Sequence, residues 1–362
     1  MTYYPIYALI THFVTLFAIL SIRFHPKILS FLYFFTASLI AFLISFLLLT
    51  DYGAYDAAYQ NINLDNSIRD SLWLIGKNPS IYEPLYTLLT HVTRAFTDNF
   101  NYVRVFMVLL TLIIKIAFLL KWGSFYSVAF VFYISVLFYP DSYLLRASLS
   151  ASFLLLAAWS IFDNKPFSRF LFFIILSAGF HISALVFLPF WFLRNVKFSS
   201  NTYFIILFFI LFTSFYSIGL PLVNFFINLF SGPENTLIFQ KLIMYANSED
   251  FMDDSGSGLS SIIYFGIVFV FIMLRARLVK IMPHYHFVLL TMLFSLLMLE
   301  GFSDIAIIGE RLFRMVSFFL VIAFGYILTV LEKKDKLYVS ILLVALFNVI
   351  PYITDAGPFI LL

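Results

Sequence analysis

The chain contains no cysteine and very little charge. The absence of cysteine excludes disulfides, thiolate nucleophiles and thiolate metal sites. Charged residues make up 11% of the chain, whereas soluble domains carry roughly 25%. The sequence also has no glycine-rich phosphate loop and no carboxylate and histidine cluster at metal-ligand spacing. We therefore expect no metal, no cofactor, no soluble nucleotide site and no nucleic-acid partner.

Long apolar segments take up most of the sequence. The chain has 362 residues, 62% of them hydrophobic, and its mean hydropathy is +0.99. A helix that crosses the hydrocarbon of a bilayer needs about 20 apolar residues, and about twelve segments approach that length. The sixth and seventh segments are short and meet at Phe180, so they form either one broken hairpin or two tilted spans. The sequence predicts an all-α, polytopic integral membrane protein with a single transmembrane domain over 1–362. The segments are 3–22, 28–49, 100–120, 123–139, 143–162, 167–180, 182–193, 202–230, 259–274, 285–300, 311–331 and 337–353.

The basic residues fall on alternate sides of these segments. With the N-terminus outside, the inner breaks hold 14 of the 22 basic residues and three acids. Short inner loops rich in Lys and Arg are typical of the cytoplasmic side of a membrane protein. Twelve spans with both ends outside fit this pattern, and the first segment is interpreted as a retained span rather than a signal peptide. The inner basic residues are Arg23, Lys27, Lys115, Lys121, Lys165, Arg169, Arg194, Lys197, Arg275, Arg277, Lys280, Lys333, Lys334 and Lys336.

Two outer segments, 50–99 and 231–258, are long, whereas the inner loops are short. Within the first, apolar residues recur at helical spacing from Leu85 to Phe96, which predicts a helix lying in the outer interface. Any chemistry is therefore expected on the outer face.

Arg146 is the first arginine in an unexpected place, because the charge pattern puts it about one and a half turns into the fifth span. A guanidinium at that depth costs a few kcal/mol, so it needs a partner. One interpretation is a structural arginine paired with an acid such as Asp141, and the other is an anion site facing a cavity. Small residues follow Arg146 over 147–152 and permit close helix approach.

Arg311 and Arg314 are three residues apart at the predicted outer start of the eleventh span, so they share a helix face. Two guanidiniums at a helix N-terminus suit a phosphate or pyrophosphate. The alternative is that Glu300, Asp304 or Glu310 neutralises them.

His181 and Glu83 are candidate proton-transfer residues. His181 is either a hydrogen-bonded structural residue or a base, because its neutral form is accessible near neutral pH. Glu83 precedes Pro84 at the start of the predicted interfacial helix. In the first outer segment, four acidic and aromatic residues suit either sugar binding or an aromatic membrane belt. They are Asp51, Tyr52, Tyr55 and Asp56.

Five short motifs resemble the EpsG-type and Wzy-type polysaccharide polymerases of bacterial envelopes. They are DYGAYDAAYQNI, EPLYTLLTHV, RASLSASFLLLA, GFHISALVFLP and ERLFRMVSFF. The resemblance covers most of the chain, and it implies a glycosyltransferase of the GT-C-like class in the bacterial cytoplasmic membrane. It implies that Glu83, Arg146, His181 and one of Arg311 and Arg314 are the functional positions.

The implied reaction joins undecaprenyl-pyrophosphate-linked oligosaccharides on the outer face, making O-antigen, capsule or exopolysaccharide. Arginines would bind the pyrophosphate, and Glu83 or His181 would take the proton of the acceptor hydroxyl. The expected partners are the lipid-linked donor and acceptor, membrane lipid and a chain-length-determining co-polymerase. Alternatives are an O-antigen ligase, a lipid-linked oligosaccharide flippase or transporter, and a membrane acyltransferase.

Overall fold

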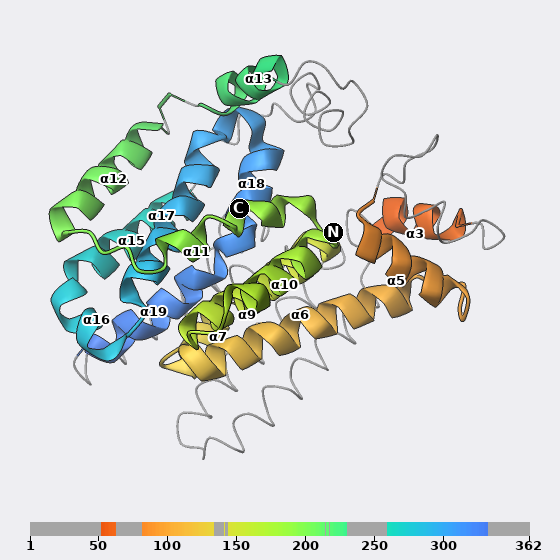
Figure 1. Cartoon of the computed structure of the whole chain (residues 1–362), viewed down its shortest axis with the longest axis horizontal. Helices are drawn as coiled ribbons and strands as arrows, with labels where there is room; N and C mark the ends of the chain where they lie inside the picture. Colours follow the sequence, from red (N-terminus) through yellow and green to blue (C-terminus); the bar gives the residue numbers. More distant parts are fainter. Residues whose placement is uncertain are drawn as a thin grey trace.

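Helices form all the regular structure in the described part of the chain. The computed structural model describes residues 52–62, 82–133, 141, 144–213, 215–216, 218–229 and 259–331. The all-α prediction is confirmed for these residues (Figure 1). The helices are α3 (Tyr52–Gln60), α5 (Pro84–Arg94), α6 (Asn101–Trp122), α7 (Tyr126–Phe132), α9 (Leu145–Phe162), α10 (Phe167–Ala178), η2 (Ile182–Phe187), α11 (Phe190–Leu193), α12 (Ser200–Thr213), α13 (Gly219–Leu229), α15 (Leu259–Met273), α16 (Arg275–Ile281), α17 (Tyr285–Gly301), η4 (Ser303–Ile305), α18 (Ala306–Val316) and α19 (Phe318–Val330).

Two helices among the described residues, α6 and α9, are long and apolar enough to cross a bilayer alone. Two bent pairs bring the number to 4: α15 with α16, bent by 79°, and α18 with α19, bent by 47°. The helices α10, α12, α17 and the stretch Ile182–Leu193 are apolar but shorter. The predicted segments 3–22, 28–49 and 337–353 and the outer segment 231–258 lie outside the described residues, so the twelve-span topology stays a prediction.

The predicted segment 202–230 is two helices rather than one. Helix α12 ends at Thr213 and α13 starts at Gly219. Pro221 lies in the first turn of α13, where its missing N–H costs nothing, and Asp304 accepts a hydrogen bond from the Leu220 N–H at 2.7 Å. The sequence between the two helices therefore starts a new helix instead of extending the old one.

Helix α9 is the centre of the first half of the fold. It packs against α6 and α10, which lie alongside it in Figure 1, and against α18. The small residues after Arg146 are buried in these contacts, and the Ser152 hydroxyl bonds the Thr111 carbonyl of α6 at 3.5 Å. This confirms the interpretation that small side chains on α9 allow its neighbours to approach closely.

Helix α19 joins the second half of the fold to the first. It packs against α7, where the rings of Phe132 and Phe324 stack with centroids 4.7 Å apart. A Cβ atom on Gly325 would lie 2.1 Å from the Ser124 carbonyl oxygen, so only glycine allows this approach.

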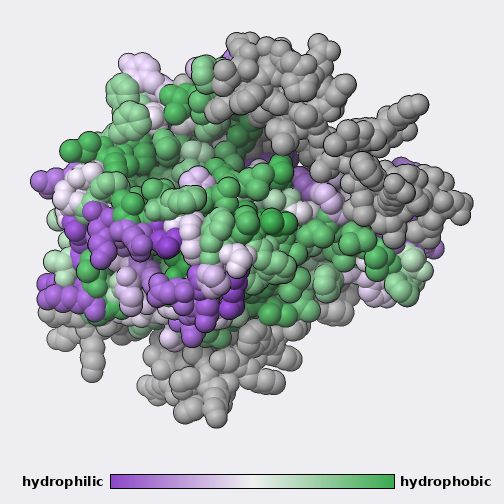
Figure 2. Space-filling view, viewed as in Figure 1, coloured by the Kyte–Doolittle hydropathy of each residue, from purple (hydrophilic) through white to green (hydrophobic). Residues whose placement is uncertain are grey.

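The described basic loops meet at one end of the molecule. The His284 ring stacks on Phe162 with centroids 4.1 Å apart and also contacts Trp122, and Arg275 donates to Ser200. These contacts join the ends of α6, α9 and α16 to the start of α12. Figure 2 shows hydrophilic residues gathered at this end, and Figure 1 shows α3 and α5 at the opposite end.

Helix α5 buries several polar residues and exposes part of its apolar stripe. Its buried residues are Tyr86, Thr87, Thr90 and His91. Val92 and Phe96 of the predicted apolar stripe are exposed by 45% and 86%, whereas Leu85 and Leu89 are partly buried and pack against the core. The helix is confirmed, and its position in a membrane interface stays a prediction.

Candidate functional site

Arg146 lies in the first turn of α9, and Glu83 is its partner. The Arg146 Nη1 forms an ion pair with the Glu83 carboxylate, and its Nε donates to the Tyr55 hydroxyl at 3.4 Å. The two side chains of the pair are 14% and 5% exposed. The sequence placed Arg146 in a span that starts at 143, and its depth in the membrane stays a prediction. Arg146 is the second residue of a helix that begins at Leu145.

Three tyrosines surround the guanidinium of Arg146. Its Cζ lies 4.7 Å from the ring centroid of Tyr82, 5.5 Å from Tyr86 and 5.8 Å from Tyr55. Ring faces attract a cation through their quadrupole, most strongly where water is excluded. Burial raises the pKa of both Tyr82 and Tyr86, so these phenols stay protonated at neutral pH. We call these tyrosines with Arg146 and Glu83 the tyrosine site.

The position of Glu83 follows from its local sequence. A proline restricts the residue before it to extended backbone, and Glu83 has φ −67° and ψ 152° ahead of Pro84. Glu83 is the N-cap residue of α5, yet its side chain makes no cap hydrogen bond to that helix. The carboxylate pairs with Arg146 instead. Helix α5 therefore lacks the stabilisation of about 1 kcal/mol that an N-cap hydrogen bond typically gives.

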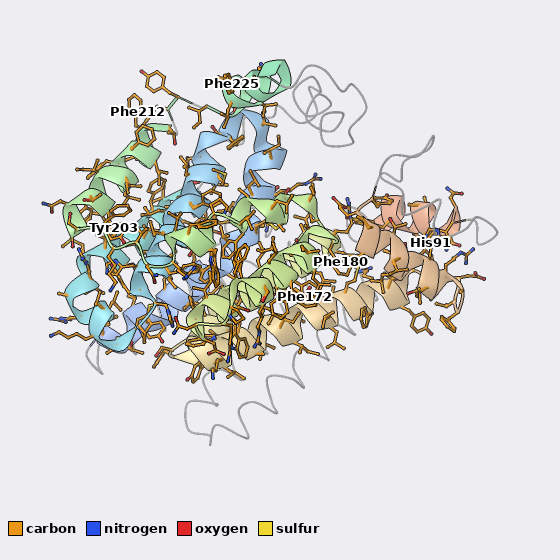
Figure 3. All side chains as sticks on the ribbon, viewed as in Figure 1. His91, Phe172, Phe180, Tyr203, Phe212 and Phe225 are labelled. Atoms are coloured by element: carbon orange, nitrogen blue, oxygen red, sulfur yellow. The ribbon has the colours of Figure 1, made fainter. Side chains whose placement is uncertain are left out.

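The break between α10 and η2 lies beside the start of α5. The Leu85 N–H donates to the Gly179 carbonyl at 2.8 Å. A Cβ atom on Gly179 would lie 2.5 Å from Leu85 Cγ, so this contact depends on glycine. Figure 3 labels Phe180 at this junction and His91 on α5. The break therefore places His181 on the same side of the molecule as Glu83.

His181 is buried and forms the N-cap of η2. Its backbone is extended, and its Nδ1 accepts a hydrogen bond from the Ser183 N–H at 3.3 Å. A neutral imidazole that accepts at Nδ1 carries its proton on Nε2. The predicted break at Phe180 and His181 is confirmed as a short helix followed by a 3-10 turn.

Ser150 brings the start of α9 into contact with α10, His181 and α18. It lies one turn after Arg146 on α9, and its hydroxyl bonds the Ser177 carbonyl at 3.0 Å and lies 3.5 Å from the His181 carbonyl. It also lies 3.8 Å from Met315 Sδ on α18. Helices α9, α10 and α18 thus meet within one turn of Arg146.

Arg311 and Arg314 are not at a helix N-terminus, so that part of the prediction is wrong. Helix α18 starts at Ala306, which puts Arg314 in its last turn. The preceding sequence AIIGE is helical as well, so the free N–H groups lie almost two turns earlier. Arg314 is buried and pairs with Glu310, one of the predicted neutralising acids, while Arg311 is only partly buried.

The other predicted neutralising acids have different neighbours. Glu300 accepts a hydrogen bond from Ser261, and Asp304 caps the start of α13 at Leu220. Asp141 does not pair with Arg146 either, because it forms an ion pair with Lys115 of α6.

The predicted sugar-binding set is divided by the structure. Tyr55 belongs to the tyrosine site, whereas Asp56 on the same helix accepts from Gln60 on a more exposed face. Asp51 and the side chain of Tyr52 lie outside the described residues. The sequence reasoning missed Tyr82 and Tyr86, although they lie four residues apart on either side of Glu83.

A buried charged group on α6 was also missed. Lys115 forms an ion pair with Asp141, and the Asp141 carboxylate also accepts a hydrogen bond from the Tyr133 hydroxyl at 2.6 Å. Lys115 Nζ lies 5.6 Å from the ring centroid of Phe318 at the bend between α18 and α19. The prediction that placed Lys115 with the basic loops is therefore wrong. Arg104, also on α6, is 2% exposed. A charge inside an apolar stretch was the available signal in both cases.

Together these observations define an integral membrane protein built from helices, with a buried arginine and carboxylate ringed by tyrosines at the end opposite its basic loops. Among the described residues, no group of three His, Asp or Glu side chains is arranged to hold a metal ion.

The profile of the EpsG family matches residues 30–355, and the chain belongs to the EpsG family. This confirms the resemblance predicted from the short motifs. The family is associated with polymerase activity of a glycosyltransferase type in polysaccharide biosynthesis. Neither the curated proteins nor the solved structures compared with the chain include a match.

Proposed function

We propose that the protein joins oligosaccharide repeat units carried on undecaprenyl pyrophosphate, at the outer face of the bacterial cytoplasmic membrane. The observation that supports this most is the pair of Arg146 and Glu83 inside the tyrosine site. It combines a fixed cation, a carboxylate and aromatic rings, which suit a pyrophosphate, a hydroxyl proton and a sugar. The basic loops at the opposite end favour an outward-facing site through the positive-inside rule.

In the proposed reaction, a hydroxyl oxygen of the acceptor sugar attacks the anomeric carbon of the donor. The bond from that carbon to the phosphate oxygen breaks, and the lipid pyrophosphate leaves with the electron pair. Arg146, with Arg314 and Arg311 on α18, stabilises the charge that develops on the leaving oxygen. The hydroxyl proton passes to Glu83, whose backbone is held by Pro84.

His181 acts as a hydrogen-bond donor in this scheme rather than as the base. Its Nδ1 accepts from the Ser183 N–H, so Nε2–H is the atom that donates to an oxygen of the pyrophosphate. Tyr55 binds the sugar together with Tyr82. Donor and acceptor are both lipid-linked. The surrounding helices form a GT-C-like architecture of twelve spans. A separate co-polymerase sets the length of the polymer. The reaction needs no nucleic acid and no cofactor.

The test is a surface-polysaccharide gel of a strain with the gene deleted, restored, or restored with a variant. We expect the ladder to collapse to one repeat unit on deletion, to return with the wild type, and to stay collapsed with Arg146→Ala and Glu83→Gln. Arg94→Ala is the matched control, because Arg94 also lies at this end but pairs with Asp98, which is 87% exposed. Immunoblots of membranes check that each variant inserts.

The gel also separates the alternatives. Loss of the single capped unit on deletion would indicate a ligase or a flippase instead of a polymerase. A normal ladder with Arg146→Ala, at normal membrane levels, would contradict the proposed role of the arginine.

A further inference from the structure

The basic end of the molecule gathers cations around the start of α12. Arg275 Nη1 donates to Ser200 Oγ at 3.2 Å, and the charges of Arg275 and Lys197 both act on His286. The His286 Nδ1 bonds the Tyr203 hydroxyl at 2.8 Å, and Figure 3 labels Tyr203 at this end of α12. Two cations and several hydroxyl and ring groups from three segments therefore meet in one place.

No carboxylate in the described part of the chain neutralises these cations. None of its ion pairs includes Arg194, Lys197, Arg275, Arg277 or Lys280. Asp163 is the acid in the neighbouring loop, and it accepts a hydrogen bond from Trp159 at 3.0 Å. An anion that binds among cations of like charge reduces their mutual repulsion.

Helix α16 has the features of a helix that lies along a membrane surface. It turns by 79° from α15 and buries Leu278. The rest of its surface mixes exposed Arg277 and Lys280 with Val279 and Ile281, which are exposed by 42% and 47%. Basic and apolar residues exposed together are typical of helices at the headgroup boundary. Arg194 lies 3.9 Å from the Trp191 ring centroid, and tryptophan is enriched at this boundary.

An apolar surface continues from the cations along α12 and α15. The rings of Phe204 and Phe269 are 5.5 Å apart and join the two helices. Further along, Phe208 and Phe212 are exposed by 63% and 57%. A soluble anion would use only the cations, whereas a phospholipid would use the cations and this surface together.

We propose that this end of the protein binds an anionic phospholipid. The lipid phosphate lies against Arg275, Lys197 and Ser200, and the acyl chains follow α12 and α15. The interaction uses none of the residues of the proposed glycosyl transfer, so it holds whether or not that function is right.

The test uses the purified full-length protein in nanodiscs of phosphatidylcholine with increasing phosphatidylglycerol, and counts retained lipids by native mass spectrometry. Each cation near an anionic surface contributes roughly fivefold to affinity. We expect the double variant Lys197→Gln/Arg275→Gln to lose about twentyfold in phosphatidylglycerol affinity and nothing in phosphatidylcholine affinity. Arg94→Gln, at the opposite end, is the matched control and should behave as wild type.

Unfolding is monitored in pure phosphatidylcholine, where the double variant and wild type should melt alike. If the double variant does not fold, Arg275→Gln and Arg275→Lys are compared singly, and only the glutamine variant should lose affinity. Equal retention of both lipids by the wild type would overturn the proposal. The proposal would also be overturned if the folded double variant bound phosphatidylglycerol as tightly as the wild type. It would be overturned as well if inorganic phosphate stabilised the protein as much as phosphatidylglycerol does.

Discussion

Removing the buried ion pair of Lys115 and Asp141 should have opposite effects when one partner or both are replaced. The two residues are 4% and 6% exposed and lie among the rings of Tyr133 and Phe318. Breaking a buried pair by removing one partner typically costs 3–5 kcal/mol, because the other charge is left uncompensated. We therefore expect Lys115→Met and Asp141→Leu each to lower the free energy of unfolding by about 4 kcal/mol.

The double variant Lys115→Met/Asp141→Leu should unfold with a free energy close to wild type or above it. Replacing a buried pair by apolar side chains of similar volume removes the desolvation penalty, and this is typically neutral or stabilising by 1–4 kcal/mol. The Tyr133 hydroxyl then loses its acceptor, so Tyr133→Phe in the double background should add stability.

Reversible unfolding in mixed micelles, followed by tryptophan fluorescence, gives the free energy of unfolding of the wild type, the two single variants and the double variant. The reasoning requires a coupling energy between the two positions near the sum of the single losses, about 8 kcal/mol if each is about 4. Additive single losses in the double variant, or single losses below about 1 kcal/mol, would refute the assignment of a desolvated pair.

Two glycine substitutions test the close contacts of the fold. Gly325→Ala should lower the free energy of unfolding by about 2–3 kcal/mol, because the new Cβ would lie 2.1 Å from the Ser124 carbonyl oxygen. Gly266→Ala in α15 is the control, since nothing lies within 4 Å of the place where its Cβ would be. Gly179→Ala should shift Leu85 and lower polymer formation by more than tenfold, with wild-type amounts of protein in the membrane. A full-length ladder from that variant would show that α5 need not dock on Gly179.

The sequence alone predicted the class of fold and several residues of the site. Apolar length predicted α6 and α9 closely, because a segment that must cross hydrocarbon leaves little choice of residue type. The break at His181 was also predicted, since GFHIS interrupts two segments too short to span separately. The arginine of α9 was singled out correctly, because a charge next to a long apolar stretch requires a partner.

The identity of that partner did not follow from the sequence. Asp141 was a plausible choice for Arg146 because it is close in the chain, but Glu83 is the partner across 63 residues. Which acid reaches which cation depends on how α5 docks against α10, and no local pattern encodes that docking. The start of α18 was misplaced for a related reason. The sequence preceding Arg311 is amphipathic rather than uniformly apolar, so a rule based on apolar length excludes it.

The position of α5 in the fold also has a consequence for biogenesis. Glu83, at the start of α5, pairs with Arg146 of α9 across 63 residues, and the Leu85 N–H bonds the Gly179 carbonyl after α10. While the chain is being made, α5 emerges long before those partners exist. Its apolar face can rest in the membrane surface during that time. The tyrosine site is then completed only when the later hairpin has inserted, so its formation is a late step in the assembly of the protein.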